Sequence, residues 1–160
     1  MIVSLKRSFD ILFSLIGLLI FSWVIIINWL IAAIETKSNG FFIQKRVGKG
    51  GSLFTLIKIK TMKQISGFNT TVTTKNDIRI TKWGHFFRRT KLDELPSLWN
   101  VLKGDMSLVG PRPDVPGYAD KLTGDNRRIL QLRPGITGPA TLKYANEEQL
   151  LANVDDPVKY

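Results

Sequence analysis

The distribution of apolar residues divides the chain into an N-terminal block and a mixed remainder. From Ile11 to Ile34 the chain runs for 24 residues without a charge. A helix of this length is about 36 Å long at 1.5 Å per residue, which exceeds the roughly 30 Å hydrocarbon core of a bilayer. The segment is apolar on every side of such a helix, as expected for contact with lipid. The pattern therefore predicts a membrane-embedded helix within residues 1–35.

Three interpretations of this helix are open. A cleaved signal peptide fits poorly, because the stretch is too long and Asp10 lies where a leader is cationic. A single crossing of the bilayer is the default. A re-entrant helix, which enters and leaves on one face, is favoured by cations at both ends, since Lys6 and Arg7 precede the stretch and a basic segment follows it. Ser22 and Asn28, at mid-depth, also require a partner or a backbone break, although the stretch contains no proline.

The next segment has the pattern of a β-hairpin. Residues 41–46 and 53–58 are predicted strands, and the Gly-rich residues 47–52 are predicted to form the turn between them. This turn lacks the spacing of a P-loop, so we interpret it as a hairpin loop rather than a phosphate cradle. A polar, Thr-rich loop is expected at 63–76.

Helical spacing returns in three later segments. In residues 78–92, Ile80, Trp83 and Phe87 share one stripe beside several cations, which suits either a helix in the membrane interface or an ordinary helix packed on the core. A Leu-periodic helix is predicted from Leu92 to Leu102, and it ends at Gly104. Residues 113–132 are predicted to form another helix, whose inward side chains are Tyr118, Leu122, Ile129 and Leu130.

Composition and charge exclude several kinds of site and suggest classes of binding partner. The chain has 160 residues, enough for one domain, and it has no cysteine, which excludes disulfides, thiolate zinc sites and cysteine nucleophiles. Its only histidine, His85, argues against a His-rich metal site and is expected to be structural or at the surface rather than catalytic. Residues 36–112 carry 15 Lys and Arg against four acids and so hold the whole excess of the +10 net charge. Such a surface suits lipid head groups, phosphorylated substrates or nucleic acid.

The adjacent acids Asp93 and Glu94 are the candidate catalytic pair. They open the predicted Leu-periodic helix, with Thr90 as its expected N-cap and Pro96 in its first turn. The helix dipole and the nearby Arg88 are expected to favour the ionised carboxylate of Asp93. One acid could then attack phosphorus while the other holds a divalent cation. The alternative is that both acids simply cap a helix.

A second candidate is Arg112, which lies between two prolines in Gly110-Pro111-Arg112-Pro113. The guanidinium group binds phosphate oxygens in pairs, and the flanking prolines restrict its backbone. The Pro/Gly segments 110–113 and 133–138 are expected to be loops of fixed shape. Arg112 is therefore either a preorganised phosphate ligand or part of a structural turn.

Several motifs in order along the chain carry a resemblance to a known family. They are Lys6-Arg7-Ser8-Phe9-Asp10, Gln44-Lys45-Arg46-Val47-Gly48, residues 54–62 (FTLIKIKTM), residues 77–81 (DIRIT), residues 88–96 (RRTKLDELP), residues 100–113 (NVLKGDMSLVGPRP) and residues 133–138 (RPGITG). Together they resemble the bacterial sugar transferases, the monotopic phosphoglycosyl transferases that begin glycoconjugate assembly. The similarity extends from residue 5 to about residue 140.

The resemblance implies an activity. A UDP-sugar donates its sugar-1-phosphate to polyprenyl (undecaprenyl) phosphate, and UMP is released. The family's Asp-Glu dyad, matched by Asp93 and Glu94, works with Mg²⁺, and the aspartate forms a covalent phosphosugar intermediate. Arg112 matches a phosphate-binding arginine, and Arg88 and Lys58 match basic positions at the site.

The resemblance also implies an architecture: an α+β, mostly helical fold on the cytoplasmic face of the bacterial inner membrane. Residues 1–35 would form a re-entrant helix-break-helix, and residues 36–160 a small cytoplasmic catalytic domain with a β-hairpin and interfacial amphipathic helices. Two departures are visible. Ser22-Trp23 stands where the family usually has a proline, and residues 141–160 match only loosely, which suggests a form truncated at the C-terminus.

A different class of function is also compatible with the charge. A non-catalytic protein on the membrane surface would bind anionic lipid through the same basic face, whatever occupies positions 93 and 94. No base-reading module is visible in the sequence, so nucleic acid is not an expected partner.

Overall fold

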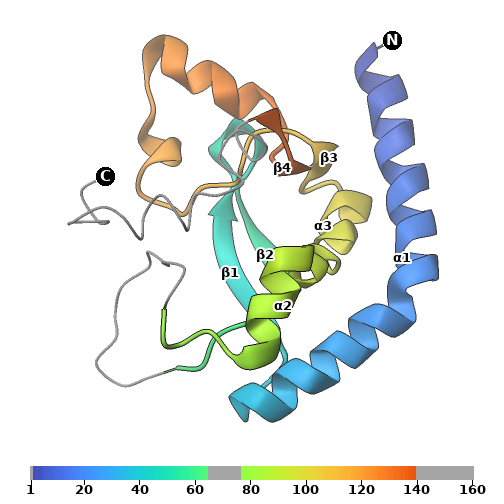
Figure 1. The fold of residues 1–160 in the computed structure, drawn as a ribbon. Helices are drawn as coiled ribbons and strands as arrows, with labels where there is room; N and C mark the ends of the chain where they lie inside the picture. The colour runs from blue at the N-terminus through green and yellow to red at the C-terminus, as the bar shows by residue number, and fades with distance from the viewer. Residues whose placement is uncertain (1, 65–76, 140–160) are drawn as a thin grey trace.

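The fold combines one long helix with a small mixed domain. We analysed a computed structural model that describes residues 2–64 and 77–139. In chain order these residues form α1 (Ile2–Thr36), β1 (Phe41–Val47), η1 (Lys49–Gly51), β2 (Leu53–Ile59), α2 (Lys82–Thr90), η2 (Leu92–Glu94), α3 (Ser97–Lys103), β3 (Ser107–Val109), η3 (Ala119–Lys121), η4 (Gly124–Gln131) and β4 (Gly135–Thr137), where η marks a 3₁₀ helix (Figure 1). The predicted α+β, mostly helical class is confirmed. The expected loop at 63–76 and the segment 141–160 lie almost entirely outside the described residues.

Helix α1 bends along its length, although it contains no proline (Figure 1). The helix is continuous from Ile2 to Thr36, so the predicted break is a bend without an interruption of helical structure. The hydroxyls of Ser14 and Ser22 donate to the carbonyls of Ile11 and Leu19, three residues back, each at 3.1 Å. Such side-chain bonds to the helix backbone commonly accompany bending.

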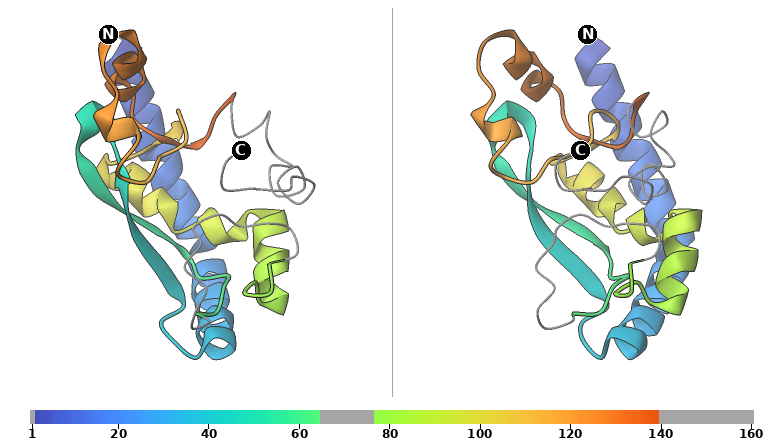
Figure 2. Two further views of the ribbon diagram at one scale, coloured as in Figure 1. Left: turned by 90° about the vertical axis from the view of Figure 1, so that its left-hand side faces the viewer. Right: turned by 60° about the vertical axis from the view of Figure 1, so that its left-hand side comes forward.

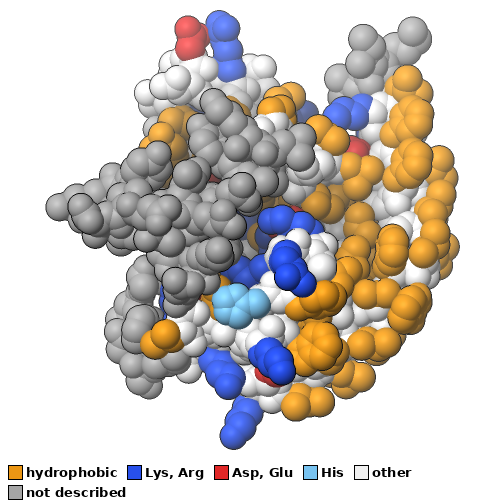
Figure 3. Space-filling view, viewed as in Figure 1, with side chains coloured by type: hydrophobic (Ala, Val, Ile, Leu, Met, Phe, Trp, Pro, Cys, Tyr) orange, Lys and Arg blue, Asp and Glu red, His pale blue; other side chains and the backbone are white. Residues whose placement is uncertain are grey.

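One face of α1 is unpartnered by the rest of the described structure. The segment Leu5–Thr36 is long and apolar enough to cross a membrane. Many of its large side chains are exposed, among them Leu12, Ile16, Leu19, Ile20, Trp23, Ile27, Leu30 and Ile34. In the space-filling view, apolar side chains form a continuous band along the outside of this helix (Figure 3). This is the surface expected for contact with hydrocarbon.

The opposite face of α1 packs on the rest of the protein. Helix α3 lies between α1 and the β1–β2 hairpin (Figure 2). A Cβ atom on Gly17 would lie 3.0 Å from a methyl group of Leu98, so the small residue allows a close approach of α1 to α3. Further along the helix, Ala32 is buried against Ile59 and Phe87.

Polar side chains at the start of α1 hold it to α3 and β3. The buried carboxylate of Asp10 accepts hydrogen bonds from the Ser107 hydroxyl at 2.9 Å and from the Leu108 amide at 3.0 Å. Arg7 donates to the carbonyls of Val101 and Leu102 in the last turn of α3, at 2.6 and 2.9 Å. At the other end of α1, the Glu35 carboxylate accepts from the Trp83 amide at the start of α2.

The hairpin confirms the predicted strands and turn. Strands β1 and β2 are antiparallel, with Arg46 opposite Phe54, Gln44 opposite Leu56 and Phe42 opposite Lys58. The main core lies between this hairpin and α3, where Phe54 and Leu56 pack with Val101 and Met106. A second, parallel pair joins β3 to β4.

The basic amphipathic helix is shorter than its sequence pattern suggested. Helix α2 begins at Lys82, and its N-cap Thr81 accepts a hydrogen bond from the Gly84 amide at 2.9 Å. Ile80 therefore lies before the helix, where it pairs with Met62 in an isolated β-bridge. Phe87 is fully buried, whereas Trp83 is 45% exposed. His85 is exposed, which agrees with the surface alternative.

The predicted helix at Leu92–Leu102 is two elements instead of one. A 3₁₀ turn covers Leu92–Glu94, and α3 begins only at Ser97, directly after Pro96. Thr90 is not the N-cap of this helix: it ends α2, and its hydroxyl donates to the Phe86 carbonyl at 2.8 Å. The predicted end at Gly104 is confirmed, because Gly104 has a φ of 102° and its amide closes the last turn of α3.

The predicted helix at 113–132 is wrong in type. Two 3₁₀ segments, η3 and η4, occupy this stretch. Leu130 is buried with Val47 and Ala119, and Leu122 packs against them, but Tyr118 and Ile129 are 70% and 47% exposed. Tyr118 precedes η3, and Ile129 lies in η4, where the 3₁₀ period differs from the 3.6-residue period of an α-helix.

Candidate active site

The acidic pair occupies the sharp connection between α2 and α3. Lys91 adopts the left-handed conformation, with φ 59°, and reverses the chain after α2. Asp93 and Glu94 then form the 3₁₀ turn η2, in which the Glu94 amide donates to the Lys91 carbonyl at 3.1 Å. Pro96 and Ser97 follow, and both are buried. The dyad is therefore held at a fixed corner of the fold rather than in a helix.

Buried polar side chains of α3 fasten this corner to β2. The Ser97 hydroxyl donates to the Ile57 carbonyl at 3.0 Å. The Asn100 amide donates to the Thr55 carbonyl at 2.7 Å and accepts from the Ile57 amide at 3.2 Å. Both side chains are about 1% exposed. Sequence reasoning missed this pair, although a polar residue at a buried position of a Leu-periodic helix is a signal that could have found Asn100.

This attachment brings Lys58 of β2 to the dyad. The Lys58 ammonium lies 3.0 Å from Glu94 Oε1, and both side chains are largely shielded from solvent. The structure thus joins three of the predicted site residues, Lys58, Asp93 and Glu94, from parts of the chain 36 residues apart.

Burial raises the pKa of Asp93 to about 6. The negative charge of Glu94 also raises this pKa, whereas the positive charges of Lys58, Arg88 and Lys91 lower it. Arg88 favours the ionised carboxylate, as expected, but burial has the larger effect, so the pKa of Asp93 is raised rather than lowered. A three-residue 3₁₀ turn supplies little dipole, and the loss of solvation outweighs the neighbouring cations.

One oxygen of Asp93 is left without a partner. Asp93 Oδ1 is buried and accepts no hydrogen bond from the part of the chain that the structure describes. A buried carboxylate oxygen without a donor is costly, so its persistence suits an atom that reacts or binds a ligand.

Arg88 approaches the dyad from the last turn of α2. Its guanidinium donates to the Thr61 hydroxyl at 3.3 Å, and its charge acts on Asp93 and also on Asp77. Asp77 makes a two-pronged ion pair with Arg79, the shortest contact being 2.6 Å, and this hydrogen bonding lowers the pKa of Asp77. The predicted basic position Arg88 is thus part of the same electrostatic environment as Asp93.

Arg112 lies in the loop that follows β3, next to Arg46 of β1. Its positive charge is one cause of a lowered pKa of Arg46, after burial. The loop is fixed by backbone bonds: the Gly110 amide donates to Thr137 and the Gly135 amide to Pro111, at 2.9 and 2.8 Å. A Cβ on Gly110 would lie 2.3 Å from the Arg133 carbonyl, which explains the glycine. The prediction of a loop of fixed shape is confirmed for 110–113, whereas residues 135–137 of the second predicted loop form strand β4.

The carboxylates suit a magnesium ion that is shared with substrate. No group of three or more His, Cys, Asp or Glu that could hold a metal occurs within residues 2–64 and 77–139. Mg²⁺ is commonly bound by one or two carboxylates together with substrate phosphates and water. Asp93 and Glu94 are the candidate pair, and the unpartnered Oδ1 of Asp93 fits such a ligand.

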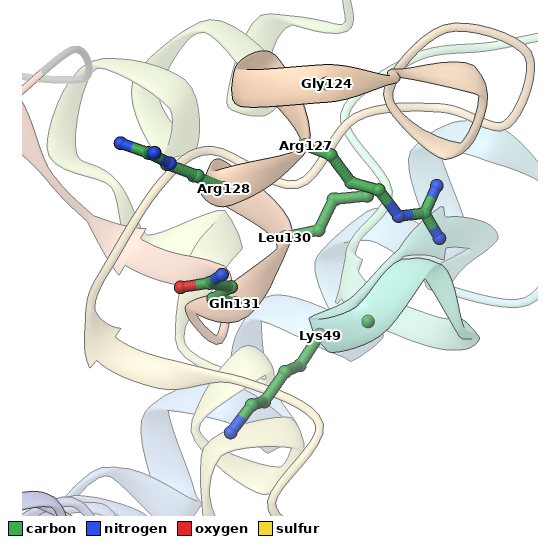
Figure 4. Close-up of a pocket in the computed structure, with 7 residues that line it drawn as sticks. Lys49, Gly124, Arg127, Arg128, Leu130 and Gln131 are labelled. Atoms are coloured by element: carbon green, nitrogen blue, oxygen red, sulfur yellow. The ribbon is translucent and has the colours of Figure 1, made fainter.

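A second basic region surrounds a hollow at the turn of the hairpin (Figure 4). It is lined by Lys49, Gly50, Gly124, Arg127, Arg128, Leu130 and Gln131. The side chains of Lys49, Arg127 and Arg128 point away from one another in Figure 4, and Arg128 pairs with Asp125 at 3.0 Å. These cations do not converge on a common point, in agreement with the interpretation of residues 47–52 as a hairpin loop.

The sequence is similar to one protein family and to several individual proteins. The profile of a family described as bacterial sugar transferase matches residues 2–160. A candidate undecaprenyl-phosphate N-acetylgalactosaminyl 1-phosphate transferase of Bacillus subtilis is 44% identical over 146 residues, which cover 91% of this chain and 80% of the relative.

Longer relatives share the same region. An undecaprenyl-phosphate galactose phosphotransferase of Salmonella typhimurium is 40% identical over 84% of this chain and 31% of its own length. A UDP-N-acetylgalactosamine-undecaprenyl-phosphate N-acetylgalactosaminephosphotransferase of Aeromonas hydrophila is 36% identical over 88% of this chain. The chain spans about a third of the length of these two relatives.

Proposed function

Since this chain belongs to the bacterial sugar transferase family, we propose that it transfers a sugar-1-phosphate from a UDP-sugar to undecaprenyl phosphate and releases UMP. The observation that carries the proposal is the shielded carboxylate of Asp93, with its unpartnered Oδ1, beside Lys58, Glu94 and Arg88. The names of the relatives supply the donor and acceptor classes.

The proposed reaction has two steps at Asp93. In the first step the carboxylate attacks the phosphorus that carries the sugar, the bond to the UMP oxygen breaks, and UMP departs with the electron pair. In the second step an oxygen of undecaprenyl phosphate attacks the same phosphorus, and the Asp93 carboxylate is released. The sugar-phosphate thus becomes one half of a lipid-linked diphosphate.

The surroundings of Asp93 suit a nucleophile. A pKa of about 6 leaves most of the carboxylate ionised at neutral pH. Partial desolvation removes water that would otherwise stabilise its charge, while Lys58 and Arg88 keep the ionised form accessible. Lys58 also orients Glu94 through their 3.0 Å ion pair.

The positive charges of Lys58 and Arg88 are also proposed to offset the negative charge of the substrate phosphates. Arg88 lies within electrostatic reach of Asp93, where the transferring phosphate would sit. We propose that Glu94 and Asp93 hold Mg²⁺, which would supply further charge neutralisation at the phosphates when bound. Arg112 is proposed as a ligand of the donor diphosphate.

The exposed apolar face of α1 supports a membrane location for the acceptor. We propose that residues 1–35 form a re-entrant membrane helix, that residues 36–160 form the catalytic domain on the cytoplasmic face, and that α2 lies in the interface with its exposed Trp83 toward lipid. Cysteines introduced at Val3 and Ser38 should both react with a probe confined to the cytoplasmic side. Labelling from opposite sides would require a spanning helix.

The decisive test is release of UMP by protein in nanodiscs supplied with a UDP-sugar panel, undecaprenyl phosphate and Mg²⁺. Donor radiolabelled in the sugar should also mark the protein when acceptor is omitted. Asp93→Asn should abolish both signals, and labelling of this variant at the wild-type level would overturn the assignment. A non-catalytic lipid-binding protein would release no UMP and would bind anionic vesicles equally well with or without Asp93.

A further inference from the structure

The motif at residues 77–81 contains an ion pair that the proposed mechanism does not use. The Asp77 carboxylate accepts hydrogen bonds from Nε and Nη2 of Arg79 at 2.9 and 2.6 Å, and from the Arg79 backbone amide at 3.0 Å. The two side chains are only 8% and 11% exposed. Because the partners are two residues apart, this pair does not by itself join distant parts of the fold. Shielded ion pairs often add little net stability, because taking both charges out of water is costly.

The segment that carries this pair lies under the helix that carries Arg88. Residues 61–63 pair with residues 79–81 through backbone hydrogen bonds, and α2 packs on them. The packing is close at Gly84, where a Cβ atom would lie 2.2 Å from the Thr61 carbonyl oxygen. Arg88 is one helical turn beyond Gly84 and so shares its face of α2. Its Nη1 donates to the Thr61 hydroxyl at 3.3 Å, which holds the guanidinium over this segment.

Arg88 lies within electrostatic reach of two carboxylates. Hydrogen bonding to Arg79 is the main cause of the lowered pKa of Asp77, and the charge of Arg88 adds to it. The same charge opposes the rise in the pKa of Asp93 that burial causes. A guanidinium binds a carboxylate strongly, so an unpaired Asp77 would attract Arg88 in competition with Asp93 and the substrate phosphate. Arg79 already donates to both oxygens of Asp77, which offsets this competition.

We propose that Arg79 is a positioning residue: by pairing with Asp77, it keeps this carboxylate from drawing the Arg88 guanidinium away from Asp93 and the transferring phosphate. The inference rests on the proposed function and gives the motif at 77–81 a place in it. Thr61 assists, since its hydroxyl holds Arg88 without adding a negative charge. Neither Arg79 nor Asp77 is proposed to touch the substrate.

The test compares Arg79→Gln with wild type as full-length protein in nanodiscs. The substitution leaves the shielded Asp77 carboxylate without the Arg79 charge, so it should attract Arg88. The donor kcat/KM for UMP release should fall about 10- to 100-fold, as expected when a phosphate loses a hydrogen bond to a charged group. Arg128→Gln is the matched control, because Arg128 also pairs with an aspartate, Asp125, at 3.0 Å. This exposed pair should be dispensable, and the control should stay within about twofold of wild type.

A second substitution tests whether Arg79 acts through Asp77. Asp77→Asn combined with Arg79→Gln removes the competing carboxylate together with its partner. The double variant should regain a donor kcat/KM within about threefold of wild type, since no carboxylate at position 77 then attracts Arg88. If Arg79 instead contacted the substrate directly, the double variant would stay as impaired as Arg79→Gln.

The pH dependence of transfer separates positioning from a change in stability. Burial raises the pKa of Asp93 to about 6, and the positive charge of Arg88 opposes this rise. Withdrawal of Arg88 toward Asp77 should therefore move the midpoint of the single-turnover rate to higher pH in Arg79→Gln, and the double variant should return it to the wild-type value. Each rate is measured well below the Tm of its variant, so that a loss of stability alone leaves the midpoint unchanged.

If Arg79→Gln does not fold, Arg79→Lys and the double variant carry the test. Lysine retains the charge that neutralises Asp77, and the double variant has no carboxylate at position 77 to neutralise. Both should therefore keep the donor kcat/KM within about threefold of wild type. A loss of about tenfold or more in either folded protein would mean that the Arg79 guanidinium itself is required, and would overturn the inference.

The outcomes distinguish this inference from the proposed function. If wild-type protein releases no UMP, the proposed function fails and the inference fails with it. If wild type is active and Arg79→Gln keeps either its donor kcat/KM or its pH midpoint, the function stands and the inference is overturned. A loss in Arg79→Gln that the double variant does not restore would also overturn it.

Discussion

Asp93 should destabilise the folded protein at neutral pH. Its pKa is raised from 3.8 to about 6 by burial. Between these values the unfolded chain has released the proton while the folded chain still holds it, so the free energy of unfolding falls as pH rises from 4 to 6 and then levels off. A difference of this size corresponds to about 3 kcal/mol of lost stability at pH 7.

Asp93→Asn removes this penalty because the amide has nearly the same shape and never ionises. The Tm of the variant should exceed that of wild type by roughly 6–12 °C at pH 7.5, since 1 kcal/mol moves the Tm of a chain of this size by about 2–4 °C. At pH 4, where the wild-type carboxyl is protonated in the folded state, the difference should shrink toward a small constant offset. The transfer reaction should be lost at both pH values.

The assay is thermal unfolding in nanodiscs across pH 4–8, with EDTA present so that no divalent cation stabilises the carboxylate. Glu94→Gln is the matched control. Glu94 is paired with Lys58 at 3.0 Å, so its neutralisation should lower the Tm rather than raise it. An Asp93→Asn Tm advantage that is equal at pH 4 and pH 7.5 would refute the reasoning, because the effect would then not arise from ionisation.

Three other predictions follow from described contacts. The single-turnover rate of sugar-phosphate transfer should rise with pH through about 6, where Asp93 becomes ionised, and a rate independent of pH from 5 to 7.5 would contradict its role as nucleophile. Asp10→Ala should lower the stability by about 2–4 kcal/mol in denaturant titrations, because the Ser107 hydroxyl and the Leu108 amide lose a charged acceptor; a wild-type midpoint would show that this contact contributes nothing. Gly110→Ala should cost more than about 3 kcal/mol, because its Cβ would lie 2.3 Å from the Arg133 carbonyl, and normal expression and Tm would disprove this constraint.

Local patterns predicted the elements whose cause is local. The Gly-rich segment 47–52 separated two strands, and the structure pairs them as a hairpin. Gly104 marked the end of α3, because a glycine adopts the left-handed conformation that closes a helix. The apolar run marked α1. The α-helix predicted at 113–132 is wrong, because the spacing of apolar residues does not separate a 3₁₀ helix from an α-helix over a few turns.

The sequence was sufficient to predict the residues of the candidate site, but not the burial and charges that surround them. The motif located Asp93 and Glu94, yet the pKa of Asp93 depends on how α3 is fastened to β2 by Ser97 and Asn100. These contacts join residues about 40 positions apart and have no local signature. The proximity of Arg46 to Arg112 is missed for the same reason.

The attachment of α1 at both ends has a consequence for how the protein sits in lipid. Arg7 and Asp10 bind α3 and β3 near one end of the helix, and Glu35 binds the start of α2 near the other. Because it is attached at both ends, α1 is expected to move together with the rest of the described structure. In a thicker or thinner bilayer, the whole molecule is therefore expected to change its tilt. The depth of Asp93 would then depend on the surrounding lipid, and under the proposed function turnover should vary with acyl chain length.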